Sequence, residues 1–69
     1  MKKLDLTKYE DVYEFAVNYE DYKNHVSLPA YLFEKIEIVM KNYNDILLTR
    51  MEAANQIIDI ICDFMNDLK

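Results

Sequence analysis

The most informative segment of this chain is residues 49–67, which read TRMEAANQIIDIICDFMND. It opens with Thr49 and Glu52 at the spacing of a capping box, in which the hydroxyl accepts a backbone N–H and the carboxylate reaches back to the first residue. Apolar residues then recur at helical intervals over about half of the circumference. They are Ala53, Ala54, Ile57, Ile58, Ile60, Ile61, Phe64, Met65 and Leu68. The segment therefore predicts an amphipathic helix over residues 50–67.

The same kind of signal marks a helix near the N-terminus. Thr7 and Glu10 have capping-box spacing, and apolar side chains follow at helical intervals as far as Lys23. Their arc is wider than the stripe that an ordinary surface helix buries. We therefore expect a first helix over residues 8–23.

The middle of the chain predicts one further helix. Ser27 can cap it with its hydroxyl, and Pro29 falls in its first turn, where a missing N–H costs nothing. Apolar residues on one face extend this helix over residues 28–44. Residues 46–48, all isoleucine or leucine, either prolong the helix or form an apolar connection packed over the end of the bundle.

Three amphipathic helices with short connections predict a single all-α domain over residues 1–69, an up-down-up antiparallel three-helix bundle. The chain has no glycine, and no segment alternates apolar and polar residues, so a sheet is not expected. The apolar arcs of the first and third helices are wider than so small a core requires. A second copy of the chain, a different protein or overhanging tyrosines can cover the surplus. We expect homodimerisation to complete the bundle.

Length and charge narrow the classes of function. Sixty-nine residues supply one core and no deep cleft, and 52% hydrophobic with 30% charged residues indicate a folded chain without a membrane span. The net charge of -5 opposes direct binding to nucleic acid. A helix-turn-helix interpretation also fails, because every charged residue between Arg50 and Lys69 is acidic, the reverse of a surface that binds phosphates.

Compartment and chemistry follow from the rare residue types. One cysteine cannot form an internal disulfide, and the charged residues after the first three exclude a signal peptide, so we expect a cytoplasmic protein. Cys62 is expected as a small buried hydrophobe and His25 as a structural or exposed residue. Neither has partners at a catalytic or metal-ligand spacing. We therefore expect no enzymatic activity, no cofactor and no metal.

Carboxylates are the most abundant polar groups. Residues 5–21 carry six of them against Lys8 alone, a balance equal to the net charge of the whole chain. Asp59, Asp63 and Asp67 repeat every four residues, where like charges repel and the last two oppose the negative end of the helix dipole. Two interpretations stay open: a solvated face that keeps the protein soluble, or an acidic surface that docks on a basic partner.

Tyrosines are interleaved with these acids. A tyrosine beside a carboxylate can grip a surface rich in lysine and arginine, although core packing explains most of the same rings. Tyr31 and Ile38 lie off the main face of the second helix and are candidates for an exposed pair. The candidate partner-binding residues are Glu10, Asp11, Glu14, Asp21, Tyr22, Tyr31, Ile38, Asp59, Asp63 and Asp67.

These features favour a small, acidic, non-enzymatic protein–protein interaction module that inhibits or regulates a larger basic partner, such as one that handles nucleic acid. Residue types with GC-rich codons (Gly, Ala, Arg and Pro) are scarce, which indicates an AT-rich genome. In size, acidity and this composition the chain is similar in type to phage-encoded inhibitors of host defence, anti-CRISPR proteins among them, and to phage host-takeover proteins. The alternative is a homodimeric structural or adaptor protein whose interface is formed by the broad apolar arcs of the first and third helices.

Overall fold

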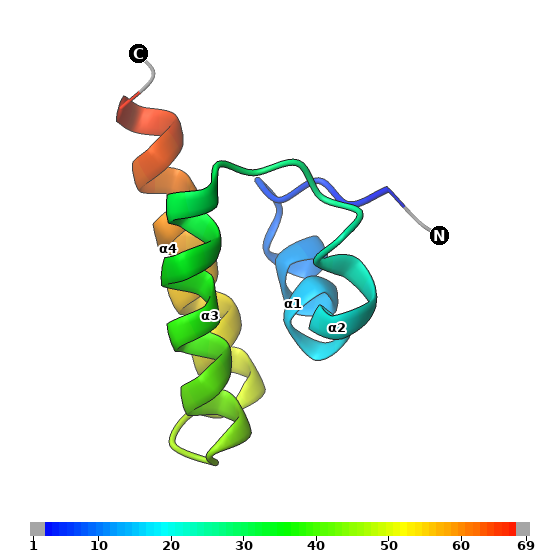
Figure 1. The fold of residues 1–69 in the computed structure, drawn as a ribbon, viewed down its shortest axis with the longest axis vertical. Coiled ribbons are helices and arrows are strands. Elements are labelled where there is room, and N and C mark those ends of the chain that lie inside the picture. Colours follow the sequence, from blue (N-terminus) through cyan, green and yellow to red (C-terminus); the bar gives the residue numbers. More distant parts are fainter. Residues whose placement is uncertain (1–2, 68–69) are drawn as a thin grey trace.

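A computed structural model describes residues 3–67 of the chain. Leu68, which the sequence places on the apolar arc of the last helix, lies outside these residues. Within them the chain forms helices and no strand, so the all-α class is confirmed (Figure 1). The helices are α1 (Tyr9–Val17), α2 (Tyr19–Tyr22), α3 (Ala30–Asn44) and α4 (Arg50–Asp67).

The helix expected over residues 8–23 is divided at Asn18, where the backbone angles φ -116° and ψ 37° leave the helical region. The backbone N–H of Asn18 donates to the carbonyl oxygen of Glu14 at 3.0 Å, and its side-chain amide donates to the same oxygen at 3.3 Å. Asparagine side chains compete with the backbone for such carbonyls and thereby favour helix ends. The expectation of one continuous helix was wrong at this residue.

The N-terminal capping box is not formed. The hydroxyl of Thr7 donates to the Asp5 Oδ1 at 2.6 Å, and the Thr7 N–H donates to the same oxygen at 3.0 Å. The residue that precedes α1 is Lys8, whose side chain makes no capping hydrogen bond. These hydrogen bonds lower the pKa of Asp5, the one from the hydroxyl most strongly. The interpretation of Thr7 and Glu10 as a capping box was therefore wrong.

The capping box expected at the start of α4 is formed. The Thr49 Oγ1 accepts a hydrogen bond from the Glu52 N–H, and the Glu52 Oε1 accepts one from the Thr49 N–H, each at 3.1 Å.

The helix α3 begins two residues later than expected. Pro29 precedes its first residue with an extended ψ of 147° instead of occupying its first turn, so Ser27 does not cap it.

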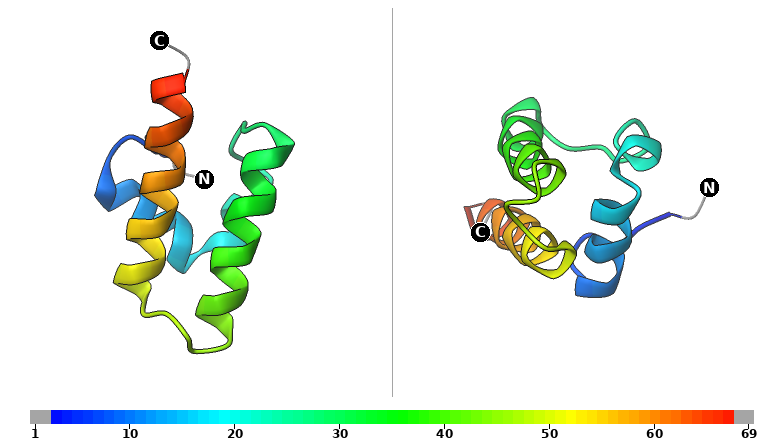
Figure 2. Two further views of the ribbon diagram at one scale, coloured as in Figure 1. Left: turned by 90° about the vertical axis from the view of Figure 1, so that its left-hand side faces the viewer. Right: turned by 90° about the horizontal axis from the view of Figure 1, so that it is seen from below.

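The helices α3 and α4 form an antiparallel hairpin, and α1 runs across it (Figures 1 and 2). Figure 1 shows α1 nearly end-on beside the upright hairpin, and the views in Figure 2 show it running crosswise. Of the helices, α4 packs against both α1 and α3. The up-down-up bundle expected from the sequence therefore holds only for the α3–α4 pair, because helical periodicity identifies a buried face without fixing the crossing angle.

The core lies between the hairpin and α1. Phe15 is fully buried and packs edge-on against the ring of Tyr19, with 5.3 Å between the ring centroids. The buried set is apolar throughout and comes from all four helices: Val12, Phe15, Ala16, Tyr19, Tyr22, Leu32, Ile36, Val39, Met40, Ala53, Ala54, Ile57 and Ile61. The broad apolar arc of the N-terminal helical segment is thus largely covered by the chain itself.

The connection between α3 and α4 differs most from expectation. The N–H of Leu47 donates to the carbonyl oxygen of Asn42 at 2.9 Å, and that of Ile46 donates to Tyr43 at 3.1 Å. These two bonds form a Schellman motif, which places Ile46 at the left-handed position that glycine usually occupies, with φ 63°. A β-branched residue is strained there.

The side chains of this connection point into solvent. Ile46 is 90% exposed and Leu47 is 70% exposed, whereas Leu48 packs against the core. Both expectations for residues 46–48, a longer helix or an apolar lid over the bundle end, were therefore wrong for the first two of them. We call Ile46 and Leu47 the hairpin tip.

Candidate protein-binding surfaces

One acidic stripe follows α4. Asp59, Asp63 and Asp67 are exposed, and their spacing places them on one side of the helix, opposite the buried Ala54 and Ile57. The last turn of α4 contains no basic residue. Within the described part of the chain, none of the three carboxylates has an ion-pair partner at 4.0 Å or less. Within residues 3–67, therefore, no basic side chain neutralises these three charges.

The exposed pair expected on the middle helix is found on α3. Tyr31 is 50% exposed and Ile38 is 64% exposed. The ring of Tyr31 contacts Phe64 of α4 edge-on, with 6.1 Å between centroids. This contact places the exposed side of α3 beside α4. Lys35, also exposed, lies between the pair on the same helix.

These residues share the face of the hairpin that is turned away from α1. Figure 2, seen from below, shows α1 and α2 on one side of the hairpin and no helix on the other side. Helical spacing directs the α3 pair and the α4 carboxylates to that uncovered side, because both sets lie opposite the buried positions of their helices. We call this surface the outer face and define it by Tyr31, Ile38, Asp59, Asp63 and Asp67.

Three of the remaining candidate residues are engaged within the chain. The Asp11 Oδ2 accepts the N–H of Asp5 at 2.7 Å, and the Glu14 Oε2 accepts the hydroxyl of Tyr22 at 3.3 Å. Tyr22 itself is buried. These groups therefore hold the N-terminal part of the fold together.

Glu10 and Asp21 are exposed, but they belong to α1 and α2, across the core from the α4 stripe. Helical spacing thus places five of the candidate residues on the outer face, whereas the other five belong to α1 and α2. The acidic residues do not form one continuous surface.

The tyrosines divide in the same way. Core packing explains three of the five tyrosines of α1, α2 and the start of α3, because Tyr19 and Tyr22 are buried and Tyr13 packs against the core, whereas Tyr9 and Tyr31 are exposed. The hydroxyl of Tyr19 donates to the Glu37 Oε1 of α3 at 2.7 Å. Burial, followed by this hydrogen bond, raises the pKa of Tyr19 above its ordinary value. Tyr31 remains available on the outer face.

Two basic side chains, Lys23 and Arg50, lie near side chains of the same chain. Lys23 pairs with Glu20 at 3.0 Å and lies 6.0 Å from the centroid of the Tyr19 ring. The neighbouring hydroxyls of Tyr43 in α3 and Tyr13 in α1 raise the pKa of Arg50 further above its ordinary value.

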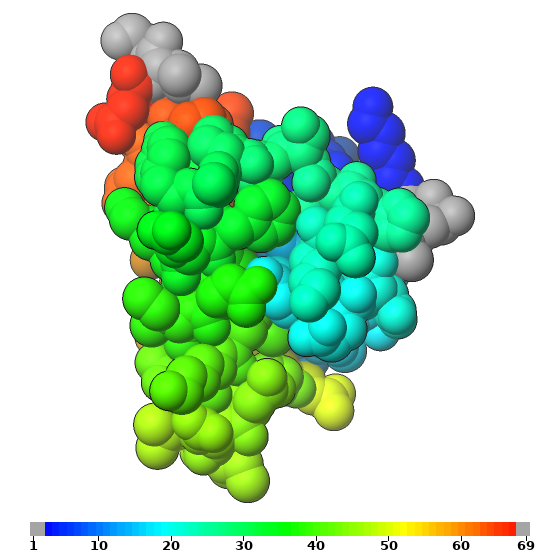
Figure 3. Space-filling model, viewed as in Figure 1, coloured from blue at the N-terminus to red at the C-terminus, as the bar shows by residue number. Residues whose placement is uncertain are grey.

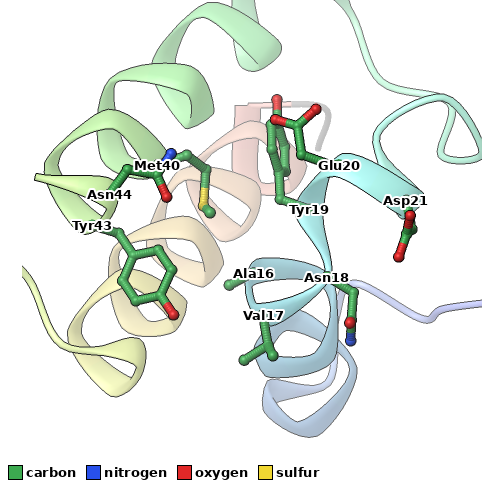
Figure 4. Close-up of a pocket in the computed structure, with 9 residues that line it drawn as sticks. All are labelled: Ala16, Val17, Asn18, Tyr19, Glu20, Asp21, Met40, Tyr43 and Asn44. Carbon is green, nitrogen blue, oxygen red and sulfur yellow. The ribbon is translucent and has the colours of Figure 1, made fainter.

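A small depression of about 180 Å³ lies where α1 and α2 meet the end of α3 (Figure 4). Figure 4 shows Met40 and Tyr43 facing Ala16 and Val17 across the opening, while the carboxylate of Asp21 points away from α3. Its lining contains no histidine, cysteine or serine; its ionisable residues are Tyr19, Glu20, Asp21 and Tyr43.

A larger groove of about 390 Å³ lies at the other end of the hairpin from the tip. It is enclosed by the N-terminal segment, the connection between α2 and α3, and the C-terminal half of α4. Seven apolar residues line it: Leu4, Leu6, Val26, Leu28, Ile61, Phe64 and Met65. Its polar lining residues are Lys3, Asp5, Thr7, His25 and Ser27.

Histidine and cysteine each occur once in the chain. His25 is exposed, as the sequence suggests. Cys62 is exposed too, so its expected burial was wrong; it lies beyond the edge of the buried stripe of α4. In residues 3–67 no cluster of three or more histidine, cysteine or acidic side chains is arranged to hold a metal ion. Nor does that part of the chain contain a helix with the length and apolar character needed to cross a bilayer.

The hairpin tip is the feature that sequence reasoning missed. The available signal was a run of three large aliphatic residues between a turn-like segment at residues 42–45 and the cap at Thr49. Three consecutive side chains, such as those of residues 46–48, cannot all point toward the same core.

Comparison of the chain with protein-family models, curated proteins and solved structures found no match.

Proposed function

We propose that this protein is a non-enzymatic interaction module that inhibits or regulates a larger basic protein through its outer face. The observation that supports it is that Tyr31 and Ile38, both exposed, share the outer face with Asp59, Asp63 and Asp67, which have no ion-pair partner within residues 3–67. Aromatic and aliphatic anchors bordered by charge are the usual composition of a protein-binding surface.

Electrostatics determine the kind of partner. Asp63 and Asp67 lie near the negative end of the α4 dipole, so the protein accepts a small cost in its own stability at this point. A lysine- or arginine-rich surface would turn that cost into attraction, while Tyr31 offers a ring to an approaching cation.

A basic surface of this kind is what proteins use to hold phosphate backbones. Covering it with carboxylates would block access by nucleic acid, which is a simple route to inhibition. The proposal therefore includes a role of the phage-encoded anti-defence or host-takeover type, consistent with the small size and acidity of the chain.

The test uses two variants with equal change in charge. Asp59→Asn/Asp63→Asn removes two negative charges from the outer face, and Glu10→Gln/Asp21→Asn removes two from the α1–α2 side. With the purified chain immobilised, proteins of the native host are captured at low and at high ionic strength. We expect a basic protein that binds at low ionic strength, is released by salt, and is lost with the outer-face variant alone. Equal loss with both variants, or no partner at low ionic strength, would contradict the proposal.

A homodimeric structural or adaptor role is the second candidate, and the exposed hairpin tip favours it. Sedimentation of the purified chain tests this second role, because an adaptor of this kind requires a stable dimer and a chain that stays monomeric at every concentration would contradict it.

A further inference from the structure

The hairpin tip presents two aliphatic side chains to water at the end of the molecule. Ile46 and Leu47 are the two most exposed large hydrophobic residues in the described part of the chain. The left-handed backbone at Ile46 adds strain that a glycine or an asparagine would relieve. The tip is therefore strained in its backbone. Its exposed side chains are also unfavourable in water unless another surface covers them.

The groove at the opposite end of the hairpin has the complementary character. Its wall is mainly aliphatic and aromatic, and its volume of about 390 Å³ is well above the roughly 150 Å³ in which an apolar cavity holds a benzene-sized group. Two aliphatic side chains therefore fit within it. Leu4, Leu6 and Leu28 at its wall are only partly buried, so an occupant would remove further apolar surface from water.

Charge contributes little to the match between the two ends. Asp45 directly precedes the tip and is exposed, whereas Lys3 and His25 lie at the groove. The carboxylate of Asp5 also lines the groove, and the hydrogen bonds from Thr7 lower its pKa and so favour its charged form. Asp5 therefore offsets the charge of Lys3, and the complementarity between tip and groove is apolar.

We propose that the hairpin tip of one copy inserts into the apolar groove of a second copy. The tip and the segments that line the groove lie at opposite ends of the hairpin (Figure 1), in a molecule with a longest extent of 35 Å. In Figure 3 the connection between α3 and α4 forms the lower end of the molecule. Two copies lying side by side in opposite directions would exchange tips and form a closed dimer; without closure, the same contact would form a chain. The contact does not involve the outer face, so this proposal and the proposed function can fail independently.

The first test removes the tip without weakening the fold. Ile46→Asn takes away the aliphatic group and places the residue type that best tolerates φ 63° after glycine, so the monomer should be as stable as the wild type or more so. Sedimentation equilibrium should show wild-type self-association and a dissociation constant at least about tenfold higher for this variant. A wild-type chain that is monomeric at every concentration would overturn the proposal.

The matched control is Ile38→Asn, the same exchange at an exposed isoleucine of the outer face. It should leave self-association unchanged. An equal weakening by Ile38→Asn would place the interface on the outer face and overturn the tip–groove contact.

The second test asks whether the tip meets a groove or another tip. Met65→Glu puts a carboxylate on the groove wall, at a partly exposed position where Glu fits a helix, and should also weaken self-association. Mixed with Ile46→Asn, it should restore part of the association, because one intact tip then meets one intact groove. Absence of any restoration would contradict the proposal.

Ionic strength gives an independent readout. Each copy carries a net charge of -5, so salt should screen the repulsion and strengthen this apolar association. The complex with a basic partner should respond to salt in the opposite direction. Self-association that salt weakens would contradict a contact driven by apolar burial.

Discussion

Apolar and acidic residues are paired within the chain on the α1–α2 side of this molecule, whereas similar residues are exposed on the α3–α4 hairpin. On the α1–α2 side, Tyr19 and Tyr22 are buried with their hydroxyls on Glu37 and Glu14. On the hairpin, exposed apolar side chains project from α3 and from the tip, and the carboxylates of α4 have no described ion-pair partner. Apolar and acidic residues together do not therefore define a binding surface; what matters is whether the fold has already paired them.

The largest expected effect comes from removing the ring on which the α1 side is built. Phe15→Ala should cost about 3–5 kcal/mol, because the side chain is fully buried and its loss leaves a cavity. A domain of this length has a stability of about 3–10 kcal/mol in total. We therefore expect a largely unfolded or barely stable variant by circular dichroism and thermal denaturation.

Ile38→Ala is the counterpart on the hairpin. Because this side chain is largely exposed, the free energy of unfolding should change by no more than about 0.5 kcal/mol. If both variants lost stability equally, the outer face would be part of a buried core and not a free surface.

The next effect concerns the hydrogen bond that ties α2 to α3. Tyr19→Phe removes the 2.7 Å contact with Glu37 and should cost about 1–2 kcal/mol at neutral pH. The folded state raises the pKa of Tyr19, so the neutral hydroxyl stabilises the fold below its ordinary pKa of about 10. That contribution should be lost as the pH rises above about 10.

Urea denaturation of both proteins at neutral and alkaline pH measures this difference. The gap between wild type and Tyr19→Phe should narrow in alkali, and the comparison isolates Tyr19 from the other tyrosines. A gap that is constant or widens with pH would show that the hydroxyl does not act through its neutral form.

Two capping-box sequences provide a smaller, internally controlled comparison. Thr49→Ala should cost about 1 kcal/mol, since its hydroxyl accepts the Glu52 N–H at the start of α4. Thr7→Ala should change stability by no more than about 0.5 kcal/mol, because Thr7 caps no helix. It should instead let the pKa of Asp5 rise toward its ordinary value, which a carboxyl NMR titration would detect. Equal costs for the two threonines would mean that the first box forms in solution.

The contrast between these threonines shows how far sequence reasoning reached. Helix existence, the start of α4 and the exposure of Tyr31 and Ile38 followed from local pattern and helical period. The break at Asn18 did not, because a polar residue on the outer side of a helix satisfies the period whether or not the helix continues. The crosswise packing of α1 depends on side-chain shape across the core, which periodicity does not encode.

The same limit applies to the candidate site. Charge counting identified both groups of carboxylates, but whether a carboxylate is free depends on neighbours distant in sequence, as with Glu14 and Tyr22. The hairpin tip escaped notice because a chain without glycine gives no sign of a left-handed residue. Ile46 adopts that conformation since the Schellman motif at the end of α3 requires it.

The smallest expected effect has the opposite sign to the others. Asp63→Asn should stabilise the fold by a few tenths of a kcal/mol, roughly, because it relieves repulsion from Asp59 and Asp67 and an unfavourable charge near the C-terminus of α4. Thermal denaturation at low ionic strength would show the gain, and added salt should erase it. The same substitution should weaken binding to the basic partner. A residue whose removal improves the fold but impairs binding is retained for the complex, whereas a variant that lost stability would show Asp63 to be structural.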